Sequence, residues 1–161
     1  MRIEKPKESL DPNAHKVWRI NGLITFVIFL MVTVGFFIVR HFFFDMPQMI
    51  GFILLGLSIF LAILNIVIIP PIRMIYWGYE IKEEEIDIQY GIIIIKRTLI
   101  PMQRIQHVDT EHGPIMRLFN LATLSVSTAG TTHKIPALKY EDAVNLRQKI
   151  SALAQVSEED V

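Results

Sequence analysis

The sequence from Ile20 to Val39 reads INGLITFVIFLMVTVGFFIV, twenty residues without an ionisable side chain. Fourteen of them are Ile, Leu, Val or Phe. At about 1.5 Å per residue, a helix of this length covers the roughly 30 Å hydrocarbon core of a bilayer. A cleavable signal peptide has a shorter apolar core followed by small residues, whereas Arg40 and His41 follow here. Residues 20–39 are therefore predicted to form a transmembrane helix.

A second uncharged stretch runs from Met49 to Ile69. The pair Pro70-Pro71 comes next, and because neither proline can donate a backbone hydrogen bond, we expect the pair to end the helix. Arg73 then marks the membrane interface. We predict a second transmembrane helix at residues 49–72.

The connection between the two spans, residues 40–48, is long enough only for a hairpin loop. Two spans place the N-terminal segment 1–19 and the C-terminal half on the same side of the membrane. The loop carries Arg40 as its only Lys or Arg, and such a bias predicts that both termini are cytoplasmic. The basic residues on the terminal side are Arg2, Lys5, Lys7, Lys16, Arg19, Arg73 and Lys82.

The second span carries small or weakly polar residues at helical spacing, namely Gly51, Ser58, Ala62 and Asn65. Small residues let two membrane helices approach closely, and an amide can hydrogen-bond between them. We interpret this stripe as a packing surface. It meets either the first helix of the same chain or a helix of a partner membrane protein.

Composition excludes several classes of function. The chain is 52% hydrophobic, and its 16 basic and 16 acidic residues balance. Neither half is basic enough to indicate nucleic acid as a partner. The absence of cysteine excludes disulfides, thiol nucleophiles and thiolate metal sites.

The second half changes to the alternating pattern of half-buried β-strands, as in Trp77, Tyr79 and Ile81. Apolar residues from Tyr140 to Ala154 then repeat at helical spacing, with acidic residues in the first turn, which predicts an amphipathic helix. We expect a β domain at 73–156 and a tail at 157–161. The predicted strands are 77–82, 85–90, 92–100, 105–110, 122–128 and 133–137, and the run Ile92 to Ile95 suggests burial on both faces or a bulge.

Three segments carry a family resemblance: IPMQRIQHVD at 100–109, GPIMRLFNLA at 113–122 and STAG at 127–130. Together they resemble the bacterial pleckstrin-homology-like (PH-like) domain of YdbS-like membrane proteins. The resemblance implies an α+β membrane protein, in which a two-helix hairpin precedes a β-sandwich or barrel of six or seven antiparallel strands with a C-terminal capping helix. Asn120 stands where the family pattern has glycine, and asparagine tolerates the left-handed conformation that glycine would adopt.

The resemblance also implies a non-catalytic scaffold in the bacterial plasma membrane. Its expected partner is a larger membrane protein with several related domains, or a second copy of the chain. A role in envelope stress or in tolerance of membrane-active peptides is a wider hypothesis. Within the shared segments, Arg104, Gln106 and Arg117 are expected to be structural, since arginine can bridge several backbone carbonyls or carboxylates.

A first alternative is contact with anionic lipid. The turn after the first strand carries Glu83, Glu84 and Glu85, which would repel a phosphoinositide. The remaining basic group, Lys96, Arg97 and Arg104, either meets lipid headgroups or is simply solvated.

A second alternative is a metal-dependent enzyme. His107, Asp109 and Glu111 alternate along a predicted strand, so they share a face and offer nitrogen and oxygen ligands. The chain has no hydrolase or phosphate-loop motif, and a polar strand face is the simpler interpretation. We therefore predict no catalytic residues, cofactor or metal.

Overall fold

The computed structural model describes residues 6–42 and 47–159 and divides into two compact units. The helical unit comprises Trp18–Pro71. The β unit combines the residues up to Val17 with those from Ile72 onward. Residues 43–46, at the centre of the predicted hairpin loop, lie outside the described residues.

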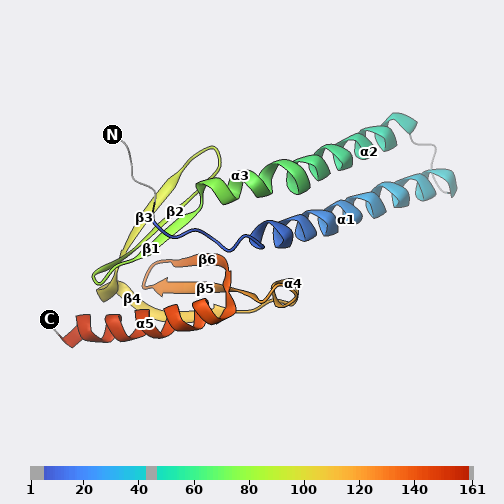
Figure 1. Cartoon of the computed structure of the whole chain (residues 1–161). Helices are drawn as coiled ribbons and strands as arrows, with labels where there is room; N and C mark the ends of the chain where they lie inside the picture. Colours follow the sequence, from blue (N-terminus) through green and yellow to red (C-terminus); the bar gives the residue numbers. More distant parts are fainter. Residues whose placement is uncertain (1–5, 43–46, 160–161) are drawn as a thin grey trace. The chain divides into compact units, whose positions relative to one another are not determined.

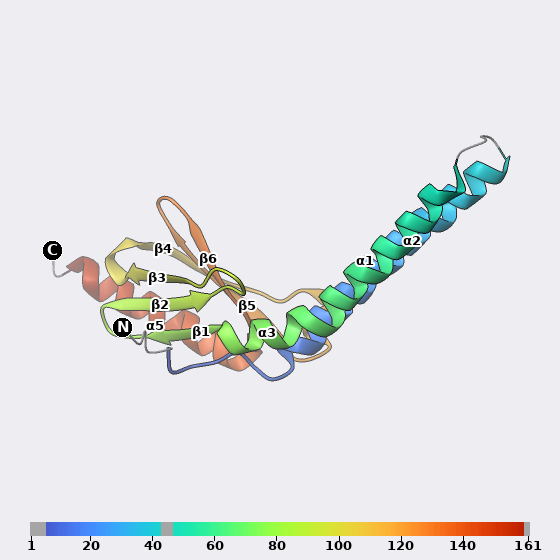
Figure 2. The ribbon, with the colours of Figure 1, turned by 90° about the horizontal axis from the view of Figure 1, so that it is seen from above.

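The helical unit is formed by the greater part of two long apolar helices, which lie side by side (Figures 1 and 2). The first is α1 (Ala14–Phe42), and the second is a continuous run of α2 (Gln48–Ala62), the π-helix η1 (Ile63–Ile68) and α3 (Ile69–Tyr76). Each run is 29 residues long, and its most apolar stretch of 18 residues has a mean hydropathy of 2.7 in the first run and 2.9 in the second. Only 11% and 6% of their most apolar windows are buried, so these helices are not the core of a soluble bundle. Their length and composition suit a bilayer.

The second helix does not end at Pro70-Pro71, contrary to the sequence prediction. It continues through both prolines to Tyr76. The π-helical segment just before them explains this, because it shifts the hydrogen-bond pattern and Ile69 N–H donates to the carbonyl of Leu64, five residues earlier. The wider turn leaves room for prolines that an ordinary helix would exclude.

The small-residue stripe of the second helix lies against α1. Gly51 and Ser58 are buried, and Phe37 of α1 covers Gly51. The hydroxyl oxygens of Thr33 and Ser58 are 3.5 Å apart. Within the helical unit the stripe therefore meets the first helix of the same chain.

Asn65, in the same stripe, does not bond across the helices. Its amide Nδ2 donates to the carbonyl of Leu61 in its own helix at 2.9 Å. Its backbone carbonyl instead lies close to α1, because a Cβ placed on Gly22 of α1 would be 2.9 Å from the Asn65 oxygen. Ala62 is half-buried between the two ends of the stripe.

The β unit contains two antiparallel three-stranded sheets and a C-terminal helix, which confirms the predicted fold class. Sheet A has the order β1 (Gly78–Ile81), β2 (Glu85–Tyr90) and β3 (Lys96–Pro101), seen side by side in Figure 2. Sheet B has the order β4 (Ile105–Glu111), β5 (Leu121–Thr128) and β6 (Thr132–Lys139). The 3-10 helix η2 (Met102–Arg104) joins the sheets, and α4 (Pro114–Arg117) precedes β5.

Helix α5 (Tyr140–Glu159) packs against η2, β4, β5 and β6. Its Ala143 and Ile150 are fully buried, together with Ile86 and Ile88 of sheet A and Leu124 of sheet B. The helix continues to Glu159, beyond the predicted start of the tail at Ser157. Asp160 and Val161 are outside the described residues.

The prediction for Asn120 is confirmed, because its φ is 53° and it thus adopts the left-handed conformation.

The prediction for Ile92 to Ile95 is wrong. These residues form an exposed loop, and β3 begins only at Lys96. Gly91, with a φ of 134°, turns the chain out of β2 before the run begins.

The segment before α1 belongs to the β unit, which the sequence did not indicate. Glu8 pairs with Tyr79 of β1 through two backbone hydrogen bonds of 3.1 and 3.0 Å. Asp11 N–H donates to the carbonyl of Ala137 in β6 at 3.2 Å, and Leu10 is buried. The β domain is therefore assembled from chain on both sides of the helical hairpin, rather than from 73–156 alone.

Candidate functional site at one end of sheet A

Strand register brings three chain segments to one end of sheet A. Gly78 pairs with Gln89, and Tyr90 pairs with Lys96. The start of β1, the end of β2 and the start of β3 therefore lie together, and the turn between β1 and β2 lies at the opposite end. We name the connection Ile92–Ile95 at this end the isoleucine loop.

The isoleucine loop exposes its apolar side chains. Ile93 is 95% exposed, Ile94 72% and Ile95 51%. A Cβ on Gly91 would meet the backbone of Ile94 and Ile95, so a side chain at that position would not allow this turn. Single exposed apolar residues are common in proteins, whereas a contiguous exposed apolar run of this kind is unusual.

A pocket of about 240 Å³ lies between residues of sheet A and the start of β6. Trp77 and Tyr90 form one wall, with their rings stacked at 6.1 Å and 27°. The pocket is smaller than the roughly 300–1,000 Å³ typical of small-molecule sites. Its remaining lining residues are Ile88, Thr132, His133 and Lys134.

The predicted basic group does not form one cluster. Lys96 and Arg97 begin β3, whereas Arg104 follows its other end, in η2. Five strand steps from Lys96 to Pro101 span roughly 17 Å. Of these three residues, Lys96 and Arg97 lie next to the isoleucine loop and Arg104 does not.

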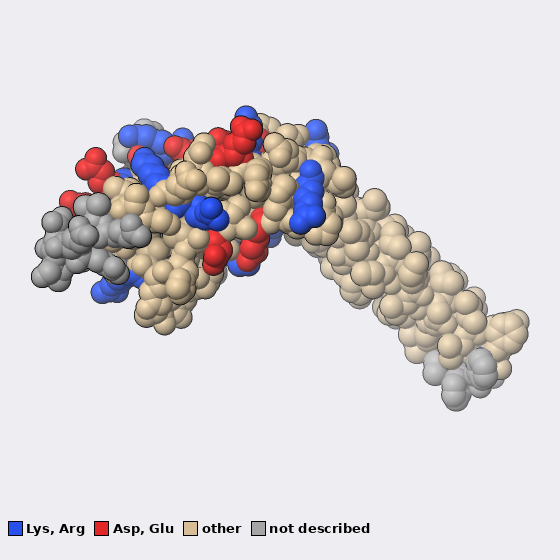
Figure 3. Space-filling view, turned by 90° about the horizontal axis from the view of Figure 1, so that it is seen from below, with Lys and Arg blue, Asp and Glu red and all other residues tan. Residues whose placement is uncertain are grey.

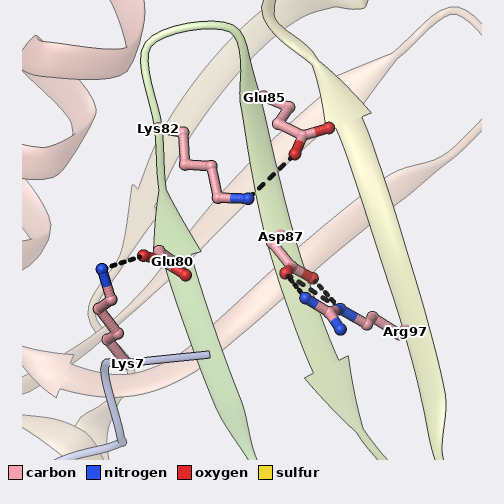
Figure 4. Close-up of polar contacts among 6 residues, drawn as sticks. All are labelled: Lys7, Glu80, Lys82, Glu85, Asp87 and Arg97. Carbon is pink, nitrogen blue, oxygen red and sulfur yellow. Dashed lines mark hydrogen bonds and ion pairs between the residues drawn. The ribbon is translucent and has the colours of Figure 1, made fainter. Parts of the chain in front are cut away.

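Arg97 is engaged by Asp87 of the neighbouring strand β2 (Figure 4). Its Nε donates to both carboxylate oxygens, at 2.9 and 3.0 Å, and its Nη2 donates to Oδ2 as well. The hydrogen bonds to Asp87 raise the pKa of the Arg97 guanidinium. The Asp87 side chain is 0% exposed, so this pair neutralises a buried carboxylate.

The opposite end of sheet A is acidic. Glu83 and Glu84 are exposed in the turn between β1 and β2, and Glu85 starts β2. Lys82 reaches Glu85 at 3.2 Å, and Lys7 reaches Glu80 at 3.4 Å (Figure 4). On the face drawn in Figure 3, charged side chains of both signs gather on the β unit, and the long helices are mostly uncharged.

His107, Asp109 and Glu111 are exposed along β4. Glu111 is held by Lys134 of β6, whose Nζ lies 3.0 Å from each carboxylate oxygen. Among residues 6–42 and 47–159, no group of three or more acidic or histidine side chains could hold a metal ion. The arrangement offers no support for the metal-enzyme alternative.

The shared-motif residues lie at turns and strand ends. Arg104 ends η2, and Gln106 is exposed at a register shift in β4. Arg117, at the end of α4, donates from Nε to the carbonyl of His112 at 3.0 Å and so bridges the turn before β5.

Tyr79 shows how the N-terminal segment is fixed on the β unit. Burial raises the pKa of its phenol, and a hydrogen bond to the Glu8 carboxylate raises it further. No sequence pattern indicates this contact, because a single bridging residue produces no periodicity. The stacked pair Trp77 and Tyr90 was equally hidden, since the two residues are far apart until the strands pair.

Two long apolar helices with exposed surfaces, followed by two three-stranded sheets closed by a helix, define a membrane protein with a PH-like domain. The chain belongs to the bacterial PH domain family, whose model matches residues 23–154.

Two Bacillus subtilis (strain 168) proteins are similar to this chain. UPF0699 transmembrane protein YdbS is 41% identical over 158 residues, which cover 98% of this chain and 99% of that protein. UPF0699 transmembrane protein YdbT is 29% identical over 76 residues, which cover 45% of this chain and 15% of that protein. No solved structure matches the chain.

Proposed function

We propose that the chain is a non-catalytic membrane subunit. The two helices anchor the PH-like domain at the cytoplasmic face of the bacterial plasma membrane, where the domain assembles with a partner membrane protein that carries a related domain. Anchoring both proteins in one membrane raises their effective concentration, so a weak contact is sufficient. A role in envelope stress is the wider hypothesis.

The similarity to YdbT carries this proposal. The matched segment is 45% of this chain but 15% of YdbT, so YdbT is about three times as long. A longer transmembrane protein therefore contains a segment related to nearly half of this chain. Related β domains offer matching sheet edges, which can pair by strand addition.

The outer edge of β3 supports the proposal. Met102 N–H donates to the Glu84 carbonyl, so these two residues form a hydrogen-bonded pair. Hydrogen-bonded and non-hydrogen-bonded pairs alternate along an antiparallel ladder, and the backbone groups of Leu99 and Arg97 therefore point away from β2. Pro101 occupies the next outward position, where a proline costs no ladder hydrogen bond. The other edge of sheet A, at β1, is already paired with Glu8.

Replacing Leu99 with proline tests the strand-addition contact. The variant removes a backbone N–H that points away from β2 and keeps the hydrogen bonds between β3 and β2. Because a partner strand would lose this donor, we expect recovery of the co-purifying membrane protein to fall by about tenfold. Leu99→Ala keeps the N–H and should retain the partner. The measurement is quantitative mass spectrometry after gentle detergent extraction at native expression, with survival under a membrane-active peptide as a second readout.

Purification of wild-type protein without any companion membrane protein would argue against the subunit proposal. If Leu99→Pro retains the companion as well as Leu99→Ala does, assembly uses another surface. Matched unfolding curves for the two variants guard against a simple loss of fold.

The proposed orientation has its own test. The contact between Glu8 and Tyr79 needs both segments on one side of the membrane, which two spans allow. The excess of Lys and Arg favours the cytoplasmic side. A phosphatase reporter, active only outside the cytoplasm, should be inactive when fused after Val161 and active when fused within residues 43–46. The reverse result would overturn the orientation.

A further inference from the structure

We propose that the isoleucine loop inserts into the interfacial layer of the bilayer that holds the chain's own helices, with Lys96 among the lipid headgroups. The loop thus gives the PH-like domain a second membrane contact, separate from the two helices and from the β3 edge.

Exposure and composition of the loop indicate an apolar environment. Three of its isoleucines are more than half exposed, and no polar side chain interrupts Ile92–Ile95. Burying exposed apolar area contributes about 25 cal/mol per Å². Four consecutive isoleucines at a hairpin tip therefore favour transfer out of water.

Strand register places the loop near the point where the chain leaves the membrane helix. The loop is at the same end of sheet A as Gly78, the first residue of β1. The six steps from Ile72 to Gly78 span at most about 20 Å, even when fully extended. The end of sheet A that carries the loop is consequently the end tethered to the anchor.

Charge distribution along sheet A favours the same orientation. Lys96 follows the isoleucines directly and is exposed, whereas Glu83 and Glu84 lie in the turn at the far end. A Lys near an anionic membrane surface contributes about 1 kcal/mol, and carboxylates are repelled. The loop end is attracted to such a surface and the acidic turn is kept away from it.

The backbone limits the depth of insertion. The isoleucine loop is not part of a strand or helix, so its amides need water or headgroups as partners and cannot enter the hydrocarbon core. Apolar faces of peripheral segments commonly reach about 5–10 Å into the boundary layer.

The test uses the full chain, whose lack of cysteine allows single-site labelling. Ile93→Cys and, as the matched control, Glu84→Cys carry an environment-sensitive fluorophore in vesicles of phosphatidylcholine and phosphatidylglycerol. We expect doxyl-labelled lipid to quench the probe at 93 but not at 84. Quenching by aqueous iodide should be at least about threefold weaker at 93 than at 84.

A second labelled variant separates loop insertion from the effect of the probe. A probe at Ile95→Cys should lose its lipid quenching when Ile93→Asp and Ile94→Asp are added, with an unchanged unfolding midpoint, because both isoleucines are exposed. Persistent lipid quenching in the aspartate variant would overturn the proposal. So would a probe at 93 that iodide quenches as strongly as at 84. Shielding from both quenchers would also overturn it, since that result means that protein covers the loop.

Discussion

Replacing Arg97 with methionine should lower the unfolding midpoint of the detergent-solubilised chain by about 10 °C or more. The Asp87 side chain is 0% exposed, and the three hydrogen bonds from Arg97 satisfy its charge. Without them the carboxylate is left buried without a hydrogen-bond partner from Arg97, and burying an unpaired charge is costly. Thermal unfolding followed by circular dichroism measures the effect.

A double variant makes this prediction specific to the buried charge. Replacing Asp87 with leucine in the Arg97→Met background removes the carboxylate that has lost its partner. Apolar pairs often substitute for buried ion pairs at little cost in stability. We expect this variant to recover most of the lost midpoint. Leu99→Ala, at an exposed position of the same strand, is the control and should change the midpoint little. An Arg97→Met midpoint equal to that of the control would show that Asp87 does not depend on the pair.

Replacing Gly22 with valine should separate the two membrane helices. A Cβ on Gly22 would lie 2.9 Å from the Asn65 carbonyl oxygen and 3.1 Å from its carbon, and this backbone cannot swing aside as a side chain can. Overpacking of this kind costs about 1–3 kcal/mol. We expect disulfide formation between Thr33→Cys and Ser58→Cys, whose native hydroxyl oxygens are 3.5 Å apart, to slow by about tenfold in membranes.

Gly35 supplies the matched control in the same helix. A Cβ there meets nothing within 4 Å, so Gly35→Val should cross-link at the wild-type rate. Equal rates for the two valine variants would show that the close approach at Gly22 does not hold the helices together. Slowing in both would point to a general effect of valine on the helix instead.

Elements that depend on local periodicity could be predicted from the amino-acid sequence alone. Long uncharged runs predicted both membrane helices, because only the bilayer makes such runs favourable over twenty residues. Alternation of apolar and polar residues predicted most of the strands, and helical spacing predicted α5. The asparagine at 120 was interpretable because its backbone preference is local.

Which surfaces are covered depends on contacts between residues that are distant in the chain. Ile92–Ile95 has the composition of a buried strand, but Gly91 turns it away from the sheet, and no local pattern reports that. Asp87 has the pattern of a solvated strand residue, yet Arg97 encloses it from the next strand. Pro70-Pro71 would normally stop a helix, and only the π-helical segment before it accommodates the pair.

The same distinction applies to the candidate site. The sequence identified Lys96, Arg97 and Arg104 as one basic group, but strand register divides them between the two ends of β3. The contact of Glu8 with Tyr79 joins a residue that precedes the helical hairpin in the sequence to one that follows it. Burial and pairing depend on residues distant in the chain, so they follow from how the strands and helices assemble. Local sequence determines only which elements are available to do so.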